Sequence, residues 1–347
     1  MSDKRDIKSM TLAELTEFTA GLGEKPYRAK QLYEWMHIRG AEDFSGMTNL
    51  SKELRERLKQ QACLTVLRQD AVQVSAIDGT RKYLFVLEDG NVIESVFMRY
   101  KHGSSVCISS QVGCRMGCRF CASTLDGLLR NLTPAEMLDQ VYRIGKDTGE
   151  RISHVVVMGT GEPLDNYENL LRFLTLLTDE DGLHISQRNV TVSTCGIVPR
   201  MRQLADEKLS FTLALSLHAC SQEKRAGLMP VANKYALSEV IDACGYYFSQ
   251  TGRRVTFEYS LVEHVNDSRE DAMELARLIR GMNCHVNLIP VNPVRERDYR
   301  QPKEDAVRQF KKILEERGIA VTVRRELGRD IDGACGQLRR KYGDHAL

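Results

Sequence analysis

Three cysteines at the spacing Cys114-x3-Cys118-x2-Cys121 could bind a metal centre. Thiolate ligands select iron-sulfur clusters, zinc or copper. Three thiolates at this spacing can hold three irons of a 4Fe-4S cluster, so that the fourth iron has no protein ligand. An iron with an open position can bind and transform another molecule, and the spacing therefore predicts chemistry in addition to electron storage.

A zinc site is the alternative for these cysteines. Structural zinc takes four protein ligands, and Cys195 and Cys220 lie far from the trio along the chain. Cys107 could supply a fourth ligand, so spacing alone leaves zinc open. The flanking sequence favours a cluster, because the glycine-rich segment Met158–Pro163 follows within one strand–helix unit. This combination resembles the radical S-adenosylmethionine (SAM) enzymes.

The elements that would position the cysteines alternate between strands and helices. Apolar runs typical of buried strands occur at residues 105–109, 154–158, 189–193, 210–217, 254–261 and 285–290. Six such units predict an α/β fold, with a parallel sheet curled into a partial (βα)6 barrel, and a seventh run covers residues 319–323. The cysteine loop follows the first strand, so we expect it at the barrel mouth.

Two further segments precede the predicted barrel. Residues 8 to about 70 have helical patterns, and Thr11 begins a capping-box signature. The apolar runs at residues 80–88 and 91–98 flank Asp89-Gly90, which is a strong signal for a β-hairpin turn. We therefore expect four parts: an N-terminal helical domain at 1–72, a β-hairpin connector at 73–100, the barrel at 101–325 and a tail at 326–347.

Polar groups follow the predicted strands at their carboxyl ends. Gly161 would let the backbone approach a ligand, and Glu162 could accept a hydrogen bond from an ammonium group. Later strand ends carry Ser193, Ser216-Leu217-His218 and Asn292. One polar group per strand end suits a polar cofactor that lies across a barrel mouth. Taken alone, the glycine could serve a turn, and His218 could be a structural histidine.

Two cysteines outside the trio have unusual surroundings. Cys107 lies seven residues before the trio, and Cys335 lies between Gly333 and Gly336 in a polar tail. Burial offers little reason for a thiol in such a tail, so a reactive role is favoured for Cys335. Glu94 lies among apolar residues of the predicted hairpin, where a solvent-facing strand position explains it as well as a functional one.

The composition is that of an ordinary globular protein, with 42% hydrophobic and 28% charged residues. No apolar stretch approaches the ~20 residues that span a bilayer, and the N-terminus leads into no apolar signal core, so we expect a cytoplasmic protein without a membrane partner. Its ten cysteines are then not a disulfide framework. The net charge of +2 does not indicate nucleic-acid binding, although basic residues outnumber acidic ones from Arg295 onward.

Six segments together resemble the RlmN/Cfr family of radical SAM RNA methyltransferases. They are Cys107–Cys114, Cys118–Cys121, Arg130–Leu132, Gly161–Leu164, Ser216–His218 and Asp332–Gln337. The resemblance covers nearly the whole chain, and the cysteines outside the trio make it far more specific than the trio alone. It implies a 4Fe-4S cluster on Cys114, Cys118 and Cys121, and SAM contacts from Gly161, Glu162, Ser193, Ser216, Leu217, His218 and Asn292.

The resemblance also implies roles for the remaining cysteines. Cys335 would take a methyl group from one SAM, and a 5′-deoxyadenosyl radical from a second SAM would remove hydrogen from that methyl. The resulting methylene radical would add to an adenine carbon and link the enzyme to RNA. Cys107 would release the product by forming a disulfide with Cys335, and Glu94 would be the base for the ring proton.

Two branches of the family methylate different carbons. One acts on carbon 2 of an adenine in 23S rRNA and of a tRNA adenine next to the anticodon. The other acts on carbon 8 of the same rRNA adenine and confers antibiotic resistance. Pro163 and the segment Cys121–Leu125 resemble the carbon-2 branch. The family also implies a flavodoxin or ferredoxin reductant, and we expect a monomer.

Two other functions are compatible with single motifs. A radical SAM maturase acting on a peptide would share the cluster, but its chemistry would give Cys335 no second cysteine to react with. An iron-sulfur or zinc RNA-binding module would bind RNA without cleaving SAM, and Cys335 would then be merely structural.

Overall fold

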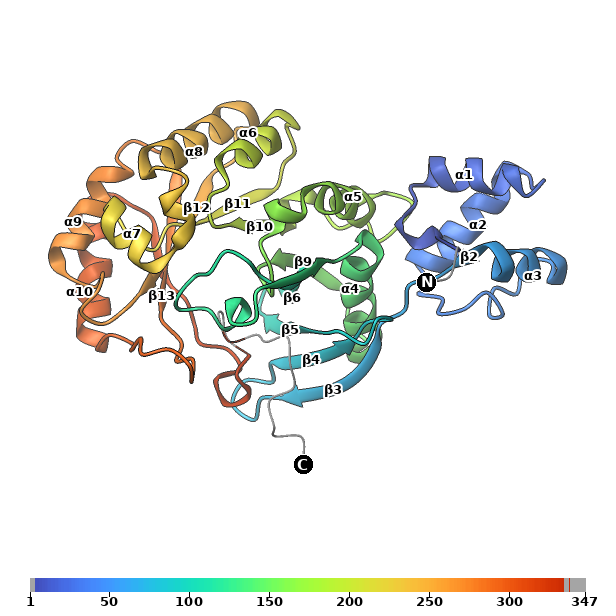
Figure 1. Cartoon of the computed structure of the whole chain (residues 1–347), viewed down its shortest axis with the longest axis horizontal. Helices are drawn as coiled ribbons and strands as arrows, with labels where there is room; N and C mark the ends of the chain where they lie inside the picture. Colours follow the sequence, from blue (N-terminus) through green and yellow to red (C-terminus); the bar gives the residue numbers. More distant parts are fainter. Residues whose placement is uncertain (1–3, 334–336, 338–347) are drawn as a thin grey trace.

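The computed structural model describes residues 4–333 and residue 337. Its centre is a ten-stranded sheet in the order β14-β13-β12-β11-β10-β9-β6-β5-β4-β3. Neighbouring strands from one edge to β6 run parallel, in chain order β6 (Gly103–Ile108), β9 (Ile152–Val157), β10 (Val190–Thr194), β11 (Thr212–Ser216), β12 (Val255–Leu261), β13 (Cys284–Pro290) and β14 (Val321–Val323). The predicted α/β fold with a curled parallel sheet is confirmed (Figure 1).

Helices connect the parallel strands and lie outside the sheet (Figure 1). They are α4 (Pro134–Thr148), α5 (Tyr167–Thr178), α6 (Val198–Asp206), α7 (Gln222–Leu228), α8 (Leu237–Thr251), α9 (Arg269–Leu278) and α10 (Glu304–Glu315). Each buries an apolar stripe, as α10 does with Val307, Phe310 and Leu314. Because every crossover returns the chain to the same end of the sheet, the carboxyl ends of the parallel strands gather at one edge.

An antiparallel extension continues the sheet beyond β6. It consists of β5 (Val92–Tyr100), β4 (Arg81–Val86) and β3 (Arg68–Val74). The predicted hairpin corresponds to β4 and β5, with Gly90 at its turn in the left-handed region. β3 lies where the sequence predicts helix up to about residue 70, and that local prediction is wrong. Its polar, exposed sequence lacks an apolar alternation, so pairing with β4 decides its conformation.

The N-terminal segment is helical, as predicted. It contains α1 (Leu12–Gly21), α2 (Pro26–His37) and α3 (Lys52–Gln61), together with the short parallel pair β1 (Arg5–Asp6) and β2 (Ala62–Cys63). The capping box at Thr11 and Glu14 begins α1. A buried ion pair joins this segment to the barrel, because the Lys8 ammonium lies 2.8 Å from the Asp139 carboxylate of α4.

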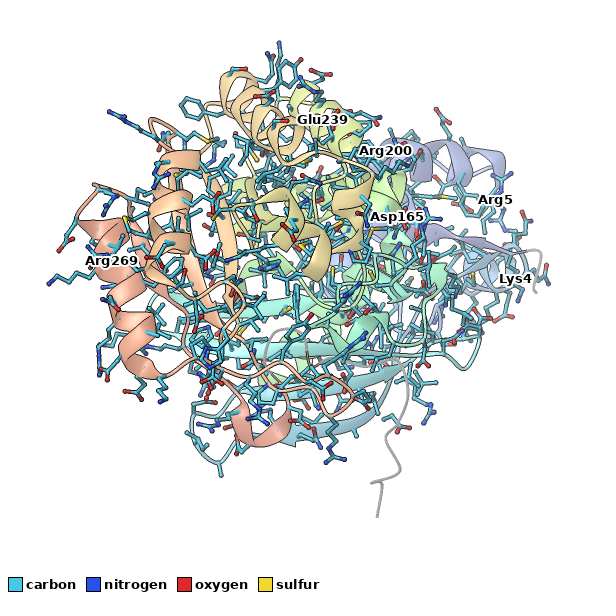
Figure 2. All side chains as sticks on the ribbon, turned by 60° about the vertical axis from the view of Figure 1, so that its left-hand side comes forward. Lys4, Arg5, Asp165, Arg200, Glu239 and Arg269 are labelled. Atoms are coloured by element: carbon cyan, nitrogen blue, oxygen red, sulfur yellow. The ribbon has the colours of Figure 1, made fainter. Side chains whose placement is uncertain are left out.

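Charged side chains cover the outside of the molecule, from Arg269 on α9 to Lys4 and Arg5 beside the N-terminal helices (Figure 2). The core beneath them is apolar and continuous from the N-terminal helices into the barrel. Among the described residues, no helix combines the length and apolar character that a bilayer span requires.

Candidate active site

The cysteine loop lies between two short strands that form its base. These are β7 (Gln111–Gly113) and β8 (Leu128–Asn131), which pair antiparallel directly after β6. Gly113 has a φ of +76°, and a Cβ atom there would lie 1.9 Å from the carbonyl oxygen of Gly127. Only glycine fits this crossing, which lets the Cys114 amide donate to the same carbonyl at 3.0 Å.

Hydrogen bonds fix the backbone of the loop. The Thr124 hydroxyl lies 3.0 Å from the carbonyl oxygens of both Cys118 and Cys121. Arg297, from the segment after β13, donates to the Thr124 hydroxyl at 3.4 Å. The Arg119 amide donates to the Leu228 carbonyl at the end of α7. The loop is therefore held from both sides of the barrel mouth.

The three cysteines line one cavity of about 920 Å³, which we call the cofactor cavity. Burial raises the pKa of the Cys114 thiol to about 12 and that of Cys118 further, so these thiols need a metal to become thiolates. Within residues 4–333 and 337, no three ligand side chains converge on a point that could hold a single metal ion. Three thiols that line one cavity are a donor set that fits a 4Fe-4S cluster with one open iron.

The strand ends bring most of the predicted SAM contacts to the same cavity. Its lining includes Gly161, Glu162, Ser193, Ser216, His218 and Asn292. Leu217 is the exception, because its side chain is fully buried in the hydrophobic core. Its backbone amide donates to the Glu258 carbonyl at 3.0 Å. Any contact from Leu217 to a cofactor would have to come from the backbone.

Gly161 occupies a position that no other residue could take without strain. Its φ is +114°, and an added Cβ atom would lie 2.7 Å from the Ser110 hydroxyl and 2.8 Å from the Gln111 amide. A Cβ atom added at the neighbouring Gly159 would lie 2.7 Å from the carbonyl oxygen of Ile108. These glycines allow the turn after β9 to pack against the strand β6, so a turn and a close approach are both required here.

Glu162 is buried at the floor of the cofactor cavity, and burial raises the pKa of its carboxyl group. One carboxylate oxygen accepts from the Cys195 amide at 2.7 Å, and the other accepts from the Leu164 amide at 3.1 Å. These two bonds fix the carboxylate plane. Each oxygen keeps further acceptor capacity, which an ammonium group could use.

His218 is held in one tautomer. Its Nδ1 accepts from the Ser260 amide at 2.9 Å, so the ring proton lies on Nε2. Burial and the nearby Arg225 lower the pKa of His218 to about 3, which keeps the ring neutral. Phe120 of the cysteine loop packs edge-on against it at 4.8 Å between ring centroids. The imidazole is therefore a fixed donor at the cavity wall.

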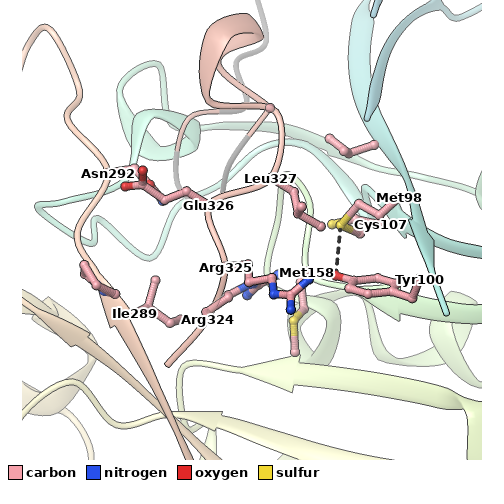
Figure 3. Close-up of a pocket in the computed structure, with 13 residues that line it drawn as sticks. Met98, Tyr100, Cys107, Met158, Ile289, Asn292, Arg324, Arg325, Glu326 and Leu327 are labelled. Carbon is pink, nitrogen blue, oxygen red and sulfur yellow. Dashed lines mark hydrogen bonds between the residues drawn. The ribbon is translucent and has the colours of Figure 1, made fainter. Parts of the chain in front are cut away.

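A second cavity of about 560 Å³ contains Cys107, and we call it the Cys107 cavity. Val96, Met98 and Tyr100 of β5 line it, and the Tyr100 hydroxyl lies 3.6 Å from the Met98 sulfur (Figure 3). Gly333 also lines it. The two cavities share one wall, formed by Met158, Ile289, Asn292 and Arg324.

The two remaining predicted catalytic residues are Glu94 and Cys335. Glu94 is buried on β5, and its carboxylate lies 3.5 Å from the Lys82 ammonium of β4. Neither cavity includes Glu94 in its lining. Cys335 lies outside the described residues.

Comparisons with known proteins agree with this geometry. Residues 5–64 match the model of the ribosomal RNA large subunit methyltransferase N-terminal domain, and residues 108–276 match the radical SAM superfamily. A protein of Lachnospira eligens named as a probable dual-specificity RNA methyltransferase RlmN is 62% identical over 97% of this chain and 96% of its own length. The chain belongs to the RlmN family of radical SAM RNA methyltransferases. It is therefore an enzyme, and membership implies a 4Fe-4S cluster and the use of SAM.

Two further comparisons cover nearly all of the chain. A probable dual-specificity RNA methyltransferase RlmN of Lachnoclostridium phytofermentans is 58% identical over 100% of this chain and 98% of its own length. The crystal structure of a radical SAM methyltransferase from Sphaerobacter thermophilus is 44% identical, with a TM-score of 0.92 over 96% of this chain and 99% of that one. The fold is therefore that of a radical SAM methyltransferase.

Three charged residues of the RlmN-family site were not found from the sequence. Glu258 lines the cofactor cavity and accepts from the Asn287 amide group at 2.9 Å. Arg324 lies in the shared wall. Arg225 of α7 is completely buried, and its guanidinium donates to the Cys195 carbonyl after β10 at 2.7 Å. An arginine within a helix gives no signal of burial. The polar Glu258 in the middle of an apolar strand was the one available signal.

Proposed function

We propose that the enzyme methylates carbon 2 of an adenine in 23S rRNA and of a tRNA adenine next to the anticodon. The reaction would proceed through a methylated cysteine and a covalent RNA intermediate. The observation that carries the proposal is the wall between the two cavities. Asn292 and Met158 border the cofactor cavity on one side and the thiol of Cys107 on the other. Chemistry at the cofactor would therefore take place next to the cavity that contains Cys107.

Two SAM molecules would serve one turnover. When bound together, the cluster and SAM supply a 5′-deoxyadenosyl radical, which can remove hydrogen from a methyl group. The chain would hold SAM through the fixed Glu162 carboxylate, the Nε2 donor of His218 and the polar strand ends at Ser193, Ser216 and Asn292. The glycine at position 161 would bring the backbone against the methionine part of SAM.

The two cysteines outside the trio would carry the covalent steps. The thiolate of Cys335 would attack the methyl carbon of the first SAM, with S-adenosylhomocysteine as the leaving group. The transferred carbon would later bond to the adenine as a methylene group. Cys107 would then attack the sulfur of Cys335. The sulfur–carbon bond breaks with its electron pair on carbon, which takes a proton to become the product methyl group. Gly333 lines the Cys107 cavity two residues before Cys335, which supports this pairing.

Glu94 would remove the ring proton. It is buried on β5, the strand next to the one that carries Cys107, and its backbone carbonyl accepts from the Ser109 hydroxyl at 2.7 Å. A general base has to be held within reach of the proton that it takes, and a buried strand supplies such rigidity.

The choice of carbon 2 rests on Pro163 and on the names of the relatives. Pro163 begins a short 3-10 helix directly after Glu162, and the resemblance associates proline here with the carbon-2 branch. The relatives of Lachnospira and Lachnoclostridium are both named as dual-specificity enzymes, which supports both rRNA and tRNA as substrates.

The remaining partners follow from this chemistry. We propose that the N-terminal segment, residues 1–72, contacts RNA and that residues 73–100, 101–325 and 326–347 form the hairpin, barrel and tail. A flavodoxin or ferredoxin would supply the electron. The enzyme would act as a cytoplasmic monomer.

Two cysteine substitutions test the proposal. Cys335→Ala should abolish methyl transfer, because the methyl acceptor is lost. Cys107→Ala should form the covalent protein–RNA adduct and fail to release it, so the adduct accumulates. Labelled SAM and denaturing gels of the anaerobic reaction measure both. Cys63→Ala is a matched control, because this thiol lies in the N-terminal segment away from both cavities. Undiminished methyl transfer by Cys335→Ala would remove the core of the proposal.

A further inference from the structure

Lys82 and Glu94 form an ion pair between neighbouring strands of the antiparallel extension. The Lys82 ammonium lies 3.5 Å from the Oε1 atom of Glu94, and the side chains are only 13% and 11% exposed. No motif in the sequence marks Lys82. Exposed ion pairs contribute little, but removal of one partner from a buried pair leaves the other charge uncompensated. Lys82 is therefore a charged partner that the Glu94 carboxylate would lose on substitution.

Strand register places this pair on the sheet face that carries Cys107. Val96 of β5 lies opposite Lys82 of β4 on one side and opposite Cys107 of β6 on the other. Residues directly opposite each other share a face, so these three side chains form one row across the sheet. Glu94 lies two residues from Val96 along β5 and therefore on the same face.

We propose that Lys82 is a positioning residue, which keeps the Glu94 carboxylate charged and oriented to remove the adenine ring proton. This inference rests on the proposed function, in which Glu94 acts on the covalent adduct. The carboxylate oxygen takes the proton, and the electron pair of the broken carbon–hydrogen bond stays in the ring. The unpaired electron that the radical addition leaves on the ring would pass to the oxidised 4Fe-4S cluster that family membership implies. Lys82 reaches the reaction only through Glu94.

Burial explains why the base needs a partner. It favours the neutral form of a carboxyl group, and a protonated Glu94 could accept no proton. A neighbouring ammonium offsets this penalty. Among the residues that the structure describes, the charged or titratable groups that line the Cys107 cavity are Tyr100 of β5, Cys107 of β6, and Arg324, Arg325 and Glu326 after β14 (Figure 3).

Two substitutions of Lys82 separate this role from a structural one. The cluster-loaded variants react anaerobically with SAM, reductant and RNA in a single turnover, and 5′-deoxyadenosine, adduct and methylated adenosine are measured. Lys82→Met should form 5′-deoxyadenosine at the wild-type rate, accumulate adduct and release product on the order of 100-fold more slowly. Lys82→Arg keeps a cation beside Glu94 and should restore release to within about tenfold of wild type.

Arg81→Met is the matched control. Arg81 is the adjacent residue on β4, and it pairs with Asp147 at 3.0 Å from the opposite face. This substitution also removes a cation from β4, but it should leave all three products unchanged.

Two results would overturn the role of Lys82. One is wild-type product release by Lys82→Met. The other is a loss of 5′-deoxyadenosine together with product, because a general structural defect would act before the adduct forms. Glu94→Gln distinguishes this failure from that of the proposed function. Normal turnover by Glu94→Gln would contradict the proposed role of Glu94 as the base. A defect in Glu94→Gln with normal turnover by Lys82→Met would contradict only the proposed role of Lys82.

Discussion

The buried guanidinium of Arg225 shows how one residue can organise the cofactor cavity. Its Nη2 donates to the carbonyls of Cys195 at 2.7 Å and Ser216 at 3.3 Å, and its Nε donates to that of Leu217 at 3.3 Å. These acceptors lie after β10 and at the end of β11. The arginine therefore ties together two strand ends that border the cavity, and the charge-assisted bonds offset the cost of its burial.

Replacement of Arg225 should weaken both folding and SAM binding. In Arg225→Met, each carbonyl left unsatisfied costs about 1–3 kcal/mol of unfolding free energy. The dissociation constant of SAM should rise roughly tenfold, because the backbone at Ser216 would no longer be fixed. Urea unfolding and calorimetric titration of the cluster-loaded protein measure the two effects. Arg225→Lys should be intermediate, since it keeps the charge but has fewer donors. An unchanged SAM affinity in Arg225→Met would contradict this account.

Local spacing made some site residues predictable. The cysteine trio and the glycine at position 161 could be found because residue type and spacing are properties of the sequence itself. Leu217 shows the limit of motif matching, because the resemblance predicts it as a SAM contact and yet its side chain is buried in the core. Arg225 and Lys82 could not be found, since their burial depends on segments far away along the chain.

Among the elements, α4 carries the junction between the N-terminal helices and the barrel. Lys8 and Asp139 form an ion pair there with side chains 1% and 0% exposed. The other carboxylate oxygen of Asp139 accepts from the Leu67 amide at 2.7 Å and from Arg143 at 3.0 Å. One buried carboxylate on α4 therefore fixes two separate points of the N-terminal segment.

Neutralising this carboxylate should destabilise the junction. Asp139→Asn keeps the shape of the side chain but leaves the Lys8 ammonium buried without its counter-charge, which costs about 3–5 kcal/mol. The free energy of unfolding in urea measures the loss. Asp305→Asn on α10 removes an exposed ion pair with Arg308 and should change stability by less than about 1 kcal/mol. Equal losses of unfolding free energy in the two variants would show that the buried ion pair stabilises the protein no more than an exposed one.

Elements with a strong apolar pattern were predictable, and those without one were not. The parallel strands of the central sheet were placed from their apolar runs, because a sheet buried on both faces requires them. The short parallel pair β1 and β2 was not predicted. β3 was missed because an exposed edge strand needs no apolar alternation, and its backbone pairing with β4 cannot be seen in the local sequence.

At the scale of the whole molecule, the sheet explains why two cavities adjoin. Its parallel strands gather their carboxyl ends around the cofactor cavity. The antiparallel strand β5 borders the adjoining cavity beside β6, the parallel strand that carries Cys107. The class of fold follows from the alternation of strands and helices. The shared wall does not, because it is built from β9, β13 and the segment after β14, and only their long-range arrangement brings them together.

The most direct measurement is nucleoside mass spectrometry of 23S rRNA and tRNA that lack the modification. The RNAs are incubated anaerobically with the cluster-loaded enzyme, SAM and a reductant, and the products are compared with authentic standards. We predict 2-methyladenosine in both RNAs. The appearance of 8-methyladenosine would contradict the choice of carbon 2. SAM cleavage without either nucleoside would contradict the RNA substrate and, with it, the proposed role of the cysteine pair.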